Sequence, residues 1–280
     1  MPIEVKNLTH IYGEGTPFER TALDSITLTI NDGEFVGIIG HTGSGKSTLI
    51  SYFNGLTKPE SGVVFVNGAD IGEKNVDLTE IRKTVGLVFQ YPEYQLFEET
   101  VAKDIAFGPK NLKLSEAEIK SRVESAMQMV GLDAYLAEKS PFELSGGQKR
   151  RVAIAGVLAM QPSILILDEP AAGLDPVGRK DMLDLVKKIH ASGVTVAMVS
   201  HSMDDVGRLC DRLFVLDHGK IAFTGTPAEV FRNADALKAI GLDVPEYAKL
   251  ANHLREAGWD IEEGLYRIED VRKAILSQIG

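Results

Sequence analysis

The sequence is short of the features that mark secreted and membrane-spanning proteins. Among its 280 residues there is one cysteine, Cys210, so no internal disulfide can form, as suits a reducing cytosol. The longest apolar runs, such as VAIAGVLAM at residues 152–160, are less than half as long as a membrane span. The N-terminal residues lack a basic segment followed by an apolar one, so they do not resemble a signal peptide. We therefore expect a soluble, cytosolic protein.

Positive charge is also scarce. The 30 lysines and arginines are outnumbered by 40 aspartates and glutamates, which gives a formal net charge of -10. A surface of this sign repels nucleic-acid phosphates as a whole, so we expect no nucleic-acid partner, and only a local basic patch would change that. The hydrophobic fraction of 44% is ample for a sizeable core, in one large domain or in a main domain with an appendage.

The hydrophobic pattern predicts an α/β chain with two kinds of strand. In ALDSITLTINDGEF, residues 22–35, apolar residues alternate with threonines before a turn, which indicates a half-buried antiparallel strand. EFVGIIG, residues 34–40, is apolar without alternation, which is typical of a strand buried on both faces. Two later runs of this kind, SILILDEP and VTVAMVSH, are separated by a segment with helical spacing, as a right-handed parallel crossover requires. The region between these two groups of strands has helical spacing, with Ser115 and Glu118 forming a predicted capping box.

The segment GHTGSGKST at residues 40–48 matches the pattern G-x-x-x-x-G-K-[ST] and lies between a predicted strand and a predicted helix. Its glycines allow backbone N–H groups to converge on phosphate oxygens at a helix N-terminus. Lys46 is expected to reach the β- and γ-phosphates of a nucleotide, and Ser47 to ligate Mg²⁺. The predicted nucleotide-binding residues of this loop are Gly40, His41, Thr42, Gly43, Ser44, Gly45, Lys46, Ser47 and Thr48. An accidental glycine turn is the alternative, and the strand–loop–helix context argues against it.

Other polar residues follow predicted strands. Asp168, in ILILDEP, can hold the metal ion, and Glu169 lies where a carboxylate can polarise an attacking water; a solvated loop is the alternative. His201 ends a third strand and is a candidate γ-phosphate contact, whereas Gln90, after KTVGLVF, suits the metal or the attacking water. Tyr12 is a candidate for stacking on adenine, with an ordinary surface tyrosine as an almost equal alternative.

LSGGQ at residues 144–148 is a second phosphate-binding pattern. Its serine, glycines and glutamine offer a hydroxyl and closely spaced amides at a helix start, but no acid, base or nucleophile. A second complete nucleotide site would need a lysine in a phosphate loop and a metal-binding carboxylate at a strand end, and this segment matches neither pattern. We therefore predict a site shared between two chains, in which LSGGQ of one chain closes over the nucleotide on the phosphate loop of the other. A serine-capped helix start is the alternative. The predicted residues are Ser145, Gly146, Gly147 and Gln148.

These motifs in this order, together with GLD at residues 173–175, resemble the ATP-binding subunit of ATP-binding cassette (ABC) transporters over residues 3–230. The resemblance implies a head-to-tail ATPase dimer with two composite ATP sites and with Mg²⁺ bound beside ATP. It also implies that Glu169 is the catalytic base, that Tyr12 stacks on adenine and that Asp175 communicates across the dimer. The chain has Ala172 where the family often has serine, which argues against a serine contact across the dimer but not against hydrolysis.

A narrower resemblance lies at residues 89–112, FQYPEYQLFEETVAKDIAFGPKNL, and in the helical tail. Both are similar to the ATPase subunits of energy-coupling factor transporters, which import vitamins and transition-metal ions, and more narrowly to the second of their two paralogous ATPases. The implied partners are a second ATPase subunit, with a paralogue favoured over a second copy, a transmembrane coupling subunit and a substrate-binding membrane subunit. The implied location is the cytoplasmic face of the membrane. The alternative is a soluble ABC-type ATPase without a membrane partner, such as an iron–sulfur assembly ATPase.

An aromatic and apolar cluster follows Gln90. Tyr91, Tyr94, Leu96 and Phe97 lie within seven residues of one another and are interrupted by three residues of other kinds. Such a cluster is usually buried core, but between a strand end and a helical region an exposed docking patch is an equally good interpretation.

The predicted fold is therefore an α/β phosphate-loop NTPase core with an antiparallel β-subdomain, a helical subdomain and a small C-terminal domain. We place the first part of the ATP-binding core, with the β-subdomain, at residues 1–95. The helical subdomain that carries LSGGQ is placed at residues 96–160, and the second part of the core at residues 161–225. Residues 226–280 form the predicted C-terminal domain, for which we expect a contact in the dimer.

Overall fold

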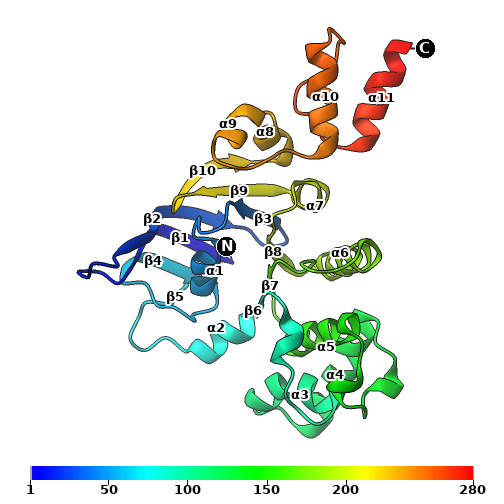
Figure 1. Cartoon of the computed structure of the whole chain (residues 1–280). Coiled ribbons are helices and arrows are strands. Elements are labelled where there is room, and N and C mark those ends of the chain that lie inside the picture. The colour runs from blue at the N-terminus through cyan, green and yellow to red at the C-terminus, as the bar shows by residue number, and fades with distance from the viewer. Residues whose placement is uncertain (1, 280) are drawn as a thin grey trace.

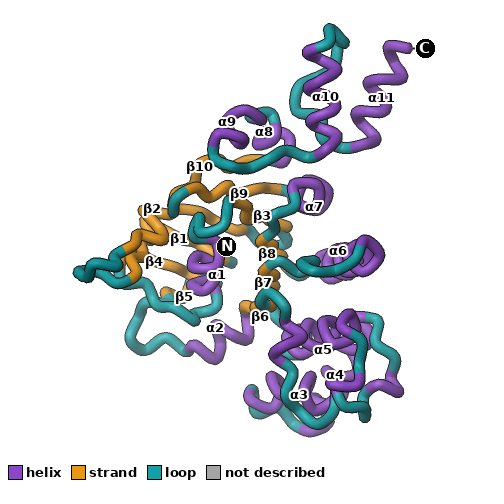
Figure 2. Tube along the Cα trace, viewed as in Figure 1, coloured by secondary structure: helices purple, strands orange, loops and turns teal. Residues whose placement is uncertain are grey.

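Two β-sheets organise the molecule. A computed structural model describes residues 2–279. The strands are β1 (Ile3–Tyr12), β2 (Arg20–Ile30), β3 (Phe35–Gly40), β4 (Ser61–Val66), β5 (Ala69–Asp70), β6 (Val85–Val88), β7 (Ile164–Asp168), β8 (Thr195–Val199), β9 (Arg212–Asp217) and β10 (Lys220–Gly225). One sheet is antiparallel, in the order β2-β1-β4-β5. The other has the order β10-β9-β3-β8-β7-β6 and is parallel except for β10 at one edge (Figures 1 and 2). The predicted α/β phosphate-loop fold with an antiparallel β part is confirmed.

The parallel strands are buried between two apolar clusters. Every residue of β3 and β8 is buried. Because successive side chains of a strand point to opposite faces, Leu165 and Leu167 of β7 join one cluster, and Ile164 and Ile166 join the other. The first cluster contains residues of the large helices, and the second contains α1 (Lys46–Phe53) and the antiparallel sheet. The non-alternating apolar pattern of these strands is explained by this burial on both faces.

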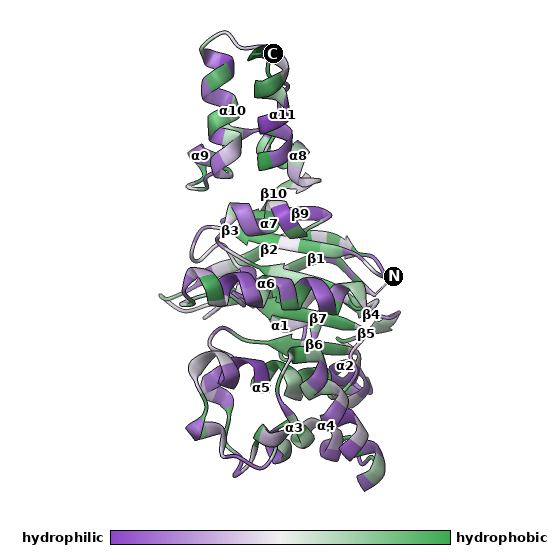
Figure 3. Cartoon of the chain, turned by 90° about the vertical axis from the view of Figure 1, so that its right-hand side faces the viewer, coloured by the Kyte–Doolittle hydropathy of each residue, from purple (hydrophilic) through white to green (hydrophobic). Residues whose placement is uncertain are grey.

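Helices cover one end of the molecule and the flank of the parallel sheet. In Figures 1 and 3, α3 (Val101–Asn111), α4 (Glu116–Val130) and α5 (Gly146–Leu158) form a helical group at the lower end. The capping box of Ser115 and Glu118 is present at the start of α4, and Gly131 ends this helix in the left-handed conformation. The remaining segments before residue 226 are α2 (Leu78–Thr84), α6 (Pro176–Ala191), α7 (Met203–Leu209), and the short 3₁₀ helices η1 (Pro92–Gln95), η2 (Ala134–Leu136) and η3 (Pro141–Glu143).

The C-terminal helices extend from the opposite end. They are α8 (Pro227–Phe231), α9 (Ala234–Ala239), α10 (Glu246–Glu256) and α11 (Ile268–Ile279) (Figure 3). Thr226 and Glu229 form the expected capping box at the start of α8. Helices α10 and α11 share a small cluster of their own, whereas Ile268, Leu276 and Ile279 of α11 are exposed. Within residues 2–279 no helix combines the length and the apolar composition that crossing a bilayer requires.

A buried arginine connects three segments that are far apart in the sequence. Arg150 of α5 is 2% exposed, and its guanidinium donates to both carboxylate oxygens of Glu93, at 2.8 and 3.0 Å. It also donates to the carbonyl oxygens of Pro170 and Ala172, at 3.1 and 2.9 Å. Burial alone would raise the pKa of Glu93, but the hydrogen bonds and charge of Arg150 hold it below its ordinary value. The planar guanidinium thus joins η1, the helix that follows LSGGQ and the turn after β7.

Candidate nucleotide-binding site

The loop between β3 and α1 has a backbone that requires glycine. Gly45 has a φ of 106°, and a Cβ there would lie 2.4 Å from the carbonyl oxygen of Ala22. A Cβ on Gly40 would lie 2.3 Å from the carbonyl oxygen of Leu216. The loop folds around the ammonium group of Lys46, which donates to the carbonyl oxygens of Gly40 and His41 at 2.7 and 3.0 Å. The loop therefore surrounds a buried positive charge, as a phosphate cradle requires.

Two buried polar groups of this loop suit an anionic ligand. Burial lowers the pKa of Lys46, and the negative charges of Glu169 and Asp168 oppose that effect. Ser44 is fully buried, and its Oγ has no hydrogen-bond partner within residues 2–279. Leaving a buried hydroxyl without a partner costs about 1–3 kcal/mol. Phosphate oxygens in the loop would give the hydroxyl of Ser44 a partner and the ammonium group of Lys46 a negatively charged neighbour.

The residues predicted to hold a metal ion lie at the edge of the parallel sheet. Ser47, in the first turn of α1, has its Oγ 3.5 Å from Oδ2 of Asp168, the last residue of β7. Burial raises the pKa of Asp168, whereas the charge of Lys46 and the hydrogen bond from Ser47 lower it. A hydroxyl and a carboxylate are the hard oxygen ligands that Mg²⁺ prefers, so this pair fits the ion.

Glu169 and His201 face each other beside this pair. Glu169 adopts a φ of 51°, and its backbone N–H donates to the carbonyl oxygen of Val199, the end of β8. Its Oε1 lies 3.4 Å from Nε2 of His201 and makes no hydrogen bond within the described residues. Burial and the charge of Asp168 raise the pKa of Glu169 to about 7, while burial and the charge of Lys46 lower the pKa of His201. Near neutral pH the site therefore contains a carboxylate poised to accept a proton and a neutral imidazole.

Tyr12 lies beside the phosphate loop, and Gln90 follows strand β6. The hydroxyl of Tyr12 is 3.1 Å from Oγ1 of Thr48 in α1, and its half-exposed ring packs against the edge of His10. This position beside the phosphate loop is compatible with stacking on a base. Gln90 is exposed and follows β6, the strand next to β7. Its side chain makes no hydrogen bond within residues 2–279, so its assigned role stays a prediction.

LSGGQ forms the start of α5, in a different part of the molecule from α1 (Figure 1). Ser145 caps the helix by accepting from the N–H of Gln148, whose side chain accepts from the N–H of Ser145 in return. Gly146 and Gly147 are exposed, and neither has a left-handed backbone. A Cβ added to either residue would meet no atom of the other described segments within 4 Å. The predicted serine cap is present, but this chain's own fold does not require the two glycines. A close approach from outside the chain would require them.

Sequence reasoning missed the link made by Arg150. Its partner Glu93 lies 57 residues away, and its other acceptors are backbone carbonyl groups that carry no sequence signal. Asp175 caps α6 through the N–H of Gly178, at 2.7 Å. Gly173, in the preceding turn, has a φ of 72°, which explains a glycine at this position.

Comparison with known proteins identifies the family. The family described as "ABC transporter" matches residues 23–172. The chain is 58% identical over 282 residues to the energy-coupling factor transporter ATP-binding protein EcfA2 of Clostridioides difficile, which covers 100% of this chain and 98% of the relative. The chain belongs to the ABC transporter ATPases. Within them it matches the energy-coupling factor subunits over its full length, as residues 89–112 indicated.

Solved structures of ABC ATPases have the same fold. The structure of cbiO1 from Clostridium perfringens, described as part of the ABC transporter complex cbiONQ, superposes with a TM-score of 0.75 at 39% identity, covering 91% of this chain and 98% of that one. The dimeric cassette MJ0796, in a post-hydrolysis state bound to ADP and Pi, superposes with a TM-score of 0.70 at 31% identity, covering 80% and 98%. Family membership establishes this ABC ATPase as an enzyme that binds and hydrolyses ATP.

The raised pKa of Glu169 predicts a pH-dependent effect of Glu169→Gln on stability. Because folding raises this pKa from 4.5 to about 7, the unfolded chain releases the proton at lower pH than the folded chain. The wild type therefore loses stability as pH rises from 4.5 to about 7. The glutamine side chain does not titrate, so the variant keeps its stability over this range. Its free energy of unfolding should exceed that of the wild type by up to about 3 kcal/mol at pH ~8, and the difference should vanish near pH ~4.5.

Urea unfolding of the nucleotide-free chain at several pH values measures this difference. Glu124→Gln is the matched control, because Glu124 is exposed on α4 and undergoes the same chemical change. A stability difference between Glu169→Gln and the wild type that is the same at all pH values would contradict the prediction.

Proposed function

We propose that this ABC ATPase powers an energy-coupling factor importer, by holding ATP between its phosphate loop and the LSGGQ segment of a partner ATPase subunit. The observation that carries the proposal is the contrast between the two phosphate-binding segments. The glycines of the loop are required by the chain's own backbone, whereas Gly146 and Gly147 are exposed and unconstrained. A similar cassette forms a dimer bound to ADP and Pi, which supports a shared site.

In this site the loop residues from Gly40 to Thr48 bind the phosphates of ATP, with Lys46 at the β- and γ-phosphates. Ser47 and Asp168 hold Mg²⁺, with Gln90 as a further ligand or as the group that orients water. Tyr12 stacks on adenine. Ser145, Gly146, Gly147 and Gln148 face the γ-phosphate held by the partner subunit. The division of the chain at residues 95, 160 and 225 is part of the same proposal.

Hydrolysis follows from the two groups at the ends of β7 and β8. Glu169 accepts the proton of the attacking water, for which a pKa of about 7 is well matched. His201, kept neutral by burial and by Lys46, offers a ring N–H to the γ-phosphate. Lys46 stabilises the negative charge on the phosphate oxygens from inside the loop. When bound, Mg²⁺ neutralises phosphate charge and supports the leaving group.

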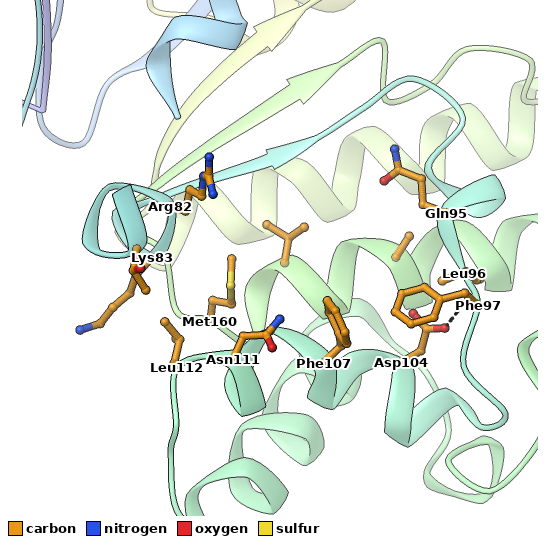
Figure 4. Close-up of a pocket in the computed structure, with 15 residues that line it drawn as sticks. Arg82, Lys83, Gln95, Leu96, Phe97, Asp104, Phe107, Asn111, Leu112 and Met160 are labelled. Carbon is orange, nitrogen blue, oxygen red and sulfur yellow. Dashed lines mark hydrogen bonds between the residues drawn. The ribbon is translucent and has the colours of Figure 1, made fainter. Parts of the chain in front are cut away.

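A groove on the helical end of the molecule is the proposed docking site for a cytoplasmic helix of the transmembrane coupling subunit (Figure 4). Its volume is about 480 Å³, and it is lined by α2, by the segment after η1, by α3 and by the end of α5. Phe97 and Phe107 pack edge to face with ring centroids 5.0 Å apart and form an exposed apolar wall. Charged groups border them: Arg82 and Lys83 on one side and Asp104 on the other.

The cluster after Gln90 belongs partly to this groove. Leu96 is buried, as the core interpretation of the cluster expects. Tyr91, Tyr94 and Phe97 are exposed, as the docking-patch interpretation expects. Asp104 accepts from the N–H groups of Phe97 and Glu98, both at 3.0 Å, and fixes the segment against α3. The names of the relatives support a membrane partner over the alternative of a soluble ATPase without one.

The proposed assembly also contains the other partners that the sequence predicts. A second ATPase subunit, a paralogue rather than a second copy, completes the two ATP sites. A transmembrane coupling subunit and a substrate-binding membrane subunit carry the cargo, a vitamin or a transition-metal ion. The chain then lies peripherally on the cytoplasmic face of the membrane, and α10 and α11 contribute to the contact between ATPase subunits.

Glu169→Gln tests the proposed base. The amide keeps the size of the side chain but cannot accept the proton, so we expect ATP binding to remain and turnover to fall by about 10²–10⁴-fold. Phosphate release in the presence of the partner ATPase subunit measures turnover, and gel filtration should show the ATP-bound dimer of the two subunits accumulating. Turnover near the wild-type rate would remove Glu169 from this role.

Ser145→Arg tests the shared site. A long cation in place of the hydroxyl blocks the approach of the partner's γ-phosphate, so we expect nucleotide binding to the isolated chain to persist while ATP-driven dimerisation and hydrolysis are lost. Lys46→Ala should instead weaken ATP binding in the isolated chain, because its charge acts on the chain's own nucleotide. Binding is measured with a fluorescent ATP analogue. Loss of that binding in Ser145→Arg would show that LSGGQ acts within its own chain.

Two further variants separate the shared site from damage to α5. Gly147→Ala retains the serine cap, and its Cβ meets no atom of residues 2–279 within 4 Å outside its chain neighbours and the nearby backbone of its helix, so a loss of dimerisation would come from the partner. Ser121→Arg adds the same side chain at an exposed position of α4 and should leave dimerisation unchanged. If two copies can pair, mixing Ser145→Arg with Lys46→Ala should restore partial hydrolysis, because one of the two sites then carries neither defect.

Phe107→Asp tests the docking groove. Phe107 is 45% exposed, and a charge there opposes burial of an apolar helix against Phe97. We expect the variant to bind ATP normally but to lose co-purification with the integral membrane subunit after detergent extraction. Phe18→Asp is the control, because Phe18 is 87% exposed and lies between β1 and β2. Equal recovery of the membrane subunit with both variants would place the docking surface elsewhere.

A further inference from the structure

Three side chains with metal-binding groups meet on the outer side of the phosphate loop. His41 belongs to the loop after β3, Asp217 is the last residue of β9, and His218 is the next residue in the turn to β10. Strands β3 and β9 are parallel neighbours, with Gly40 paired to Leu216, so their carboxyl ends bring these residues together. One nitrogen or oxygen atom from each of the three lies within 4.8 Å of the others.

The hydrogen bonds of His41 determine which of its nitrogens can bind a cation. Nδ1 lies 2.9 Å from the carbonyl oxygen of Thr42, and because a carbonyl oxygen can only accept, Nδ1 carries the hydrogen. Nε2 lies 3.0 Å from Oδ1 of Asp217. In the neutral ring this nitrogen has a lone pair, which would face a carboxylate lone pair. A metal ion placed between the two atoms would accept both lone pairs.

His218 supplies a third ligand to the same position. Its Nε2 lies 3.8 Å from Oδ1 of Asp217, and its ring centroid is 4.9 Å from that of His41. Zinc bonds of about 2.0–2.1 Å in tetrahedral geometry place ligand atoms about 3.4 Å apart, and the distances of 3.0 and 3.8 Å lie on either side of this value. The His218 side chain is 84% exposed, so its ring can rotate into position.

We infer that His41, Asp217 and His218 bind one divalent transition-metal ion, with Zn²⁺ as the representative. Two imidazoles and one carboxylate suit Zn²⁺, Co²⁺ or Ni²⁺, whereas Mg²⁺ prefers oxygen ligands alone. The N–H of His41 bonded to a carbonyl oxygen is the arrangement that orients metal-ligating histidines. This site is separate from Ser47 and Asp168 and does not depend on the proposed transport function. It connects the phosphate loop to the β9–β10 turn.

Zn²⁺ titration by calorimetry tests the site in untagged, chelator-treated, nucleotide-free protein. Because Asp168 is a proposed Mg²⁺ ligand, every variant is made in an Asp168→Asn background. His218→Asn removes the imidazole and suits the left-handed backbone at this position, where φ is 43°. This variant and Asp217→Asn are expected to bind Zn²⁺ at least about tenfold more weakly than the background protein.

His253→Ala is the matched control, because it removes an exposed histidine from α10 and should leave the affinity unchanged. Co²⁺ should give visible absorption bands of a tetrahedral site in the background protein and not in His218→Asn. If His218→Asn and Asp217→Asn bind Zn²⁺ as tightly as the background protein, or if the background protein binds none, the inference is overturned.

Discussion

Burial of the parallel strands on both faces is the constraint on which the rest of the structure depends. Apolar clusters cover both faces of β3, β7 and β8, so their interiors tolerate no unpaired polar side chain. Polar side chains of these strands are therefore confined to their ends: Thr195 at the amino end of β8 and Asp168 at the carboxyl end of β7. At the carboxyl ends the phosphate loop, the Asp168–Glu169 pair and His201 lie together, because parallel strands end at the same edge of the sheet.

Electrostatic balance at this edge explains why the site favours a nucleotide. Lys46 is buried beside two carboxyl groups whose pKa values burial raises, and the buried hydroxyl of Ser44 has no partner among residues 2–279. The phosphate cradle thus contains polar groups whose interactions within the chain are incomplete. Phosphate oxygens would supply such interactions, and the close approaches at Gly40 and Gly45 leave no room for a side chain in the loop.

Arg150 connects the two proposed interaction surfaces, LSGGQ and the docking groove, to the turn that follows Glu169. It lies in the helix that LSGGQ begins, and it bonds to Glu93, which precedes the groove-lining residues Gln95, Leu96 and Phe97. It also bonds to the carbonyl oxygens of Pro170 and Ala172, directly after Glu169. One buried guanidinium thus links α5 both to the segment that leads into the groove and to the turn after Glu169. The rigid fork geometry of arginine suits this role better than lysine.

The sequence by itself determined the elements that depend on local pattern. Strand burial follows from uninterrupted apolar runs, the phosphate loop from glycine spacing, and the starts of α4 and α8 from capping boxes, all of which involve residues near one another in the chain. The tertiary structure decided what depends on distant contacts and on desolvation. It paired Arg150 with Glu93 and His41 with Asp217, 57 and 176 residues apart, and buried Leu96 while exposing Phe97. It also raised the pKa of Glu169 to about 7, because removal of water and proximity to Asp168 arise only when β7 and β8 are packed within the sheet.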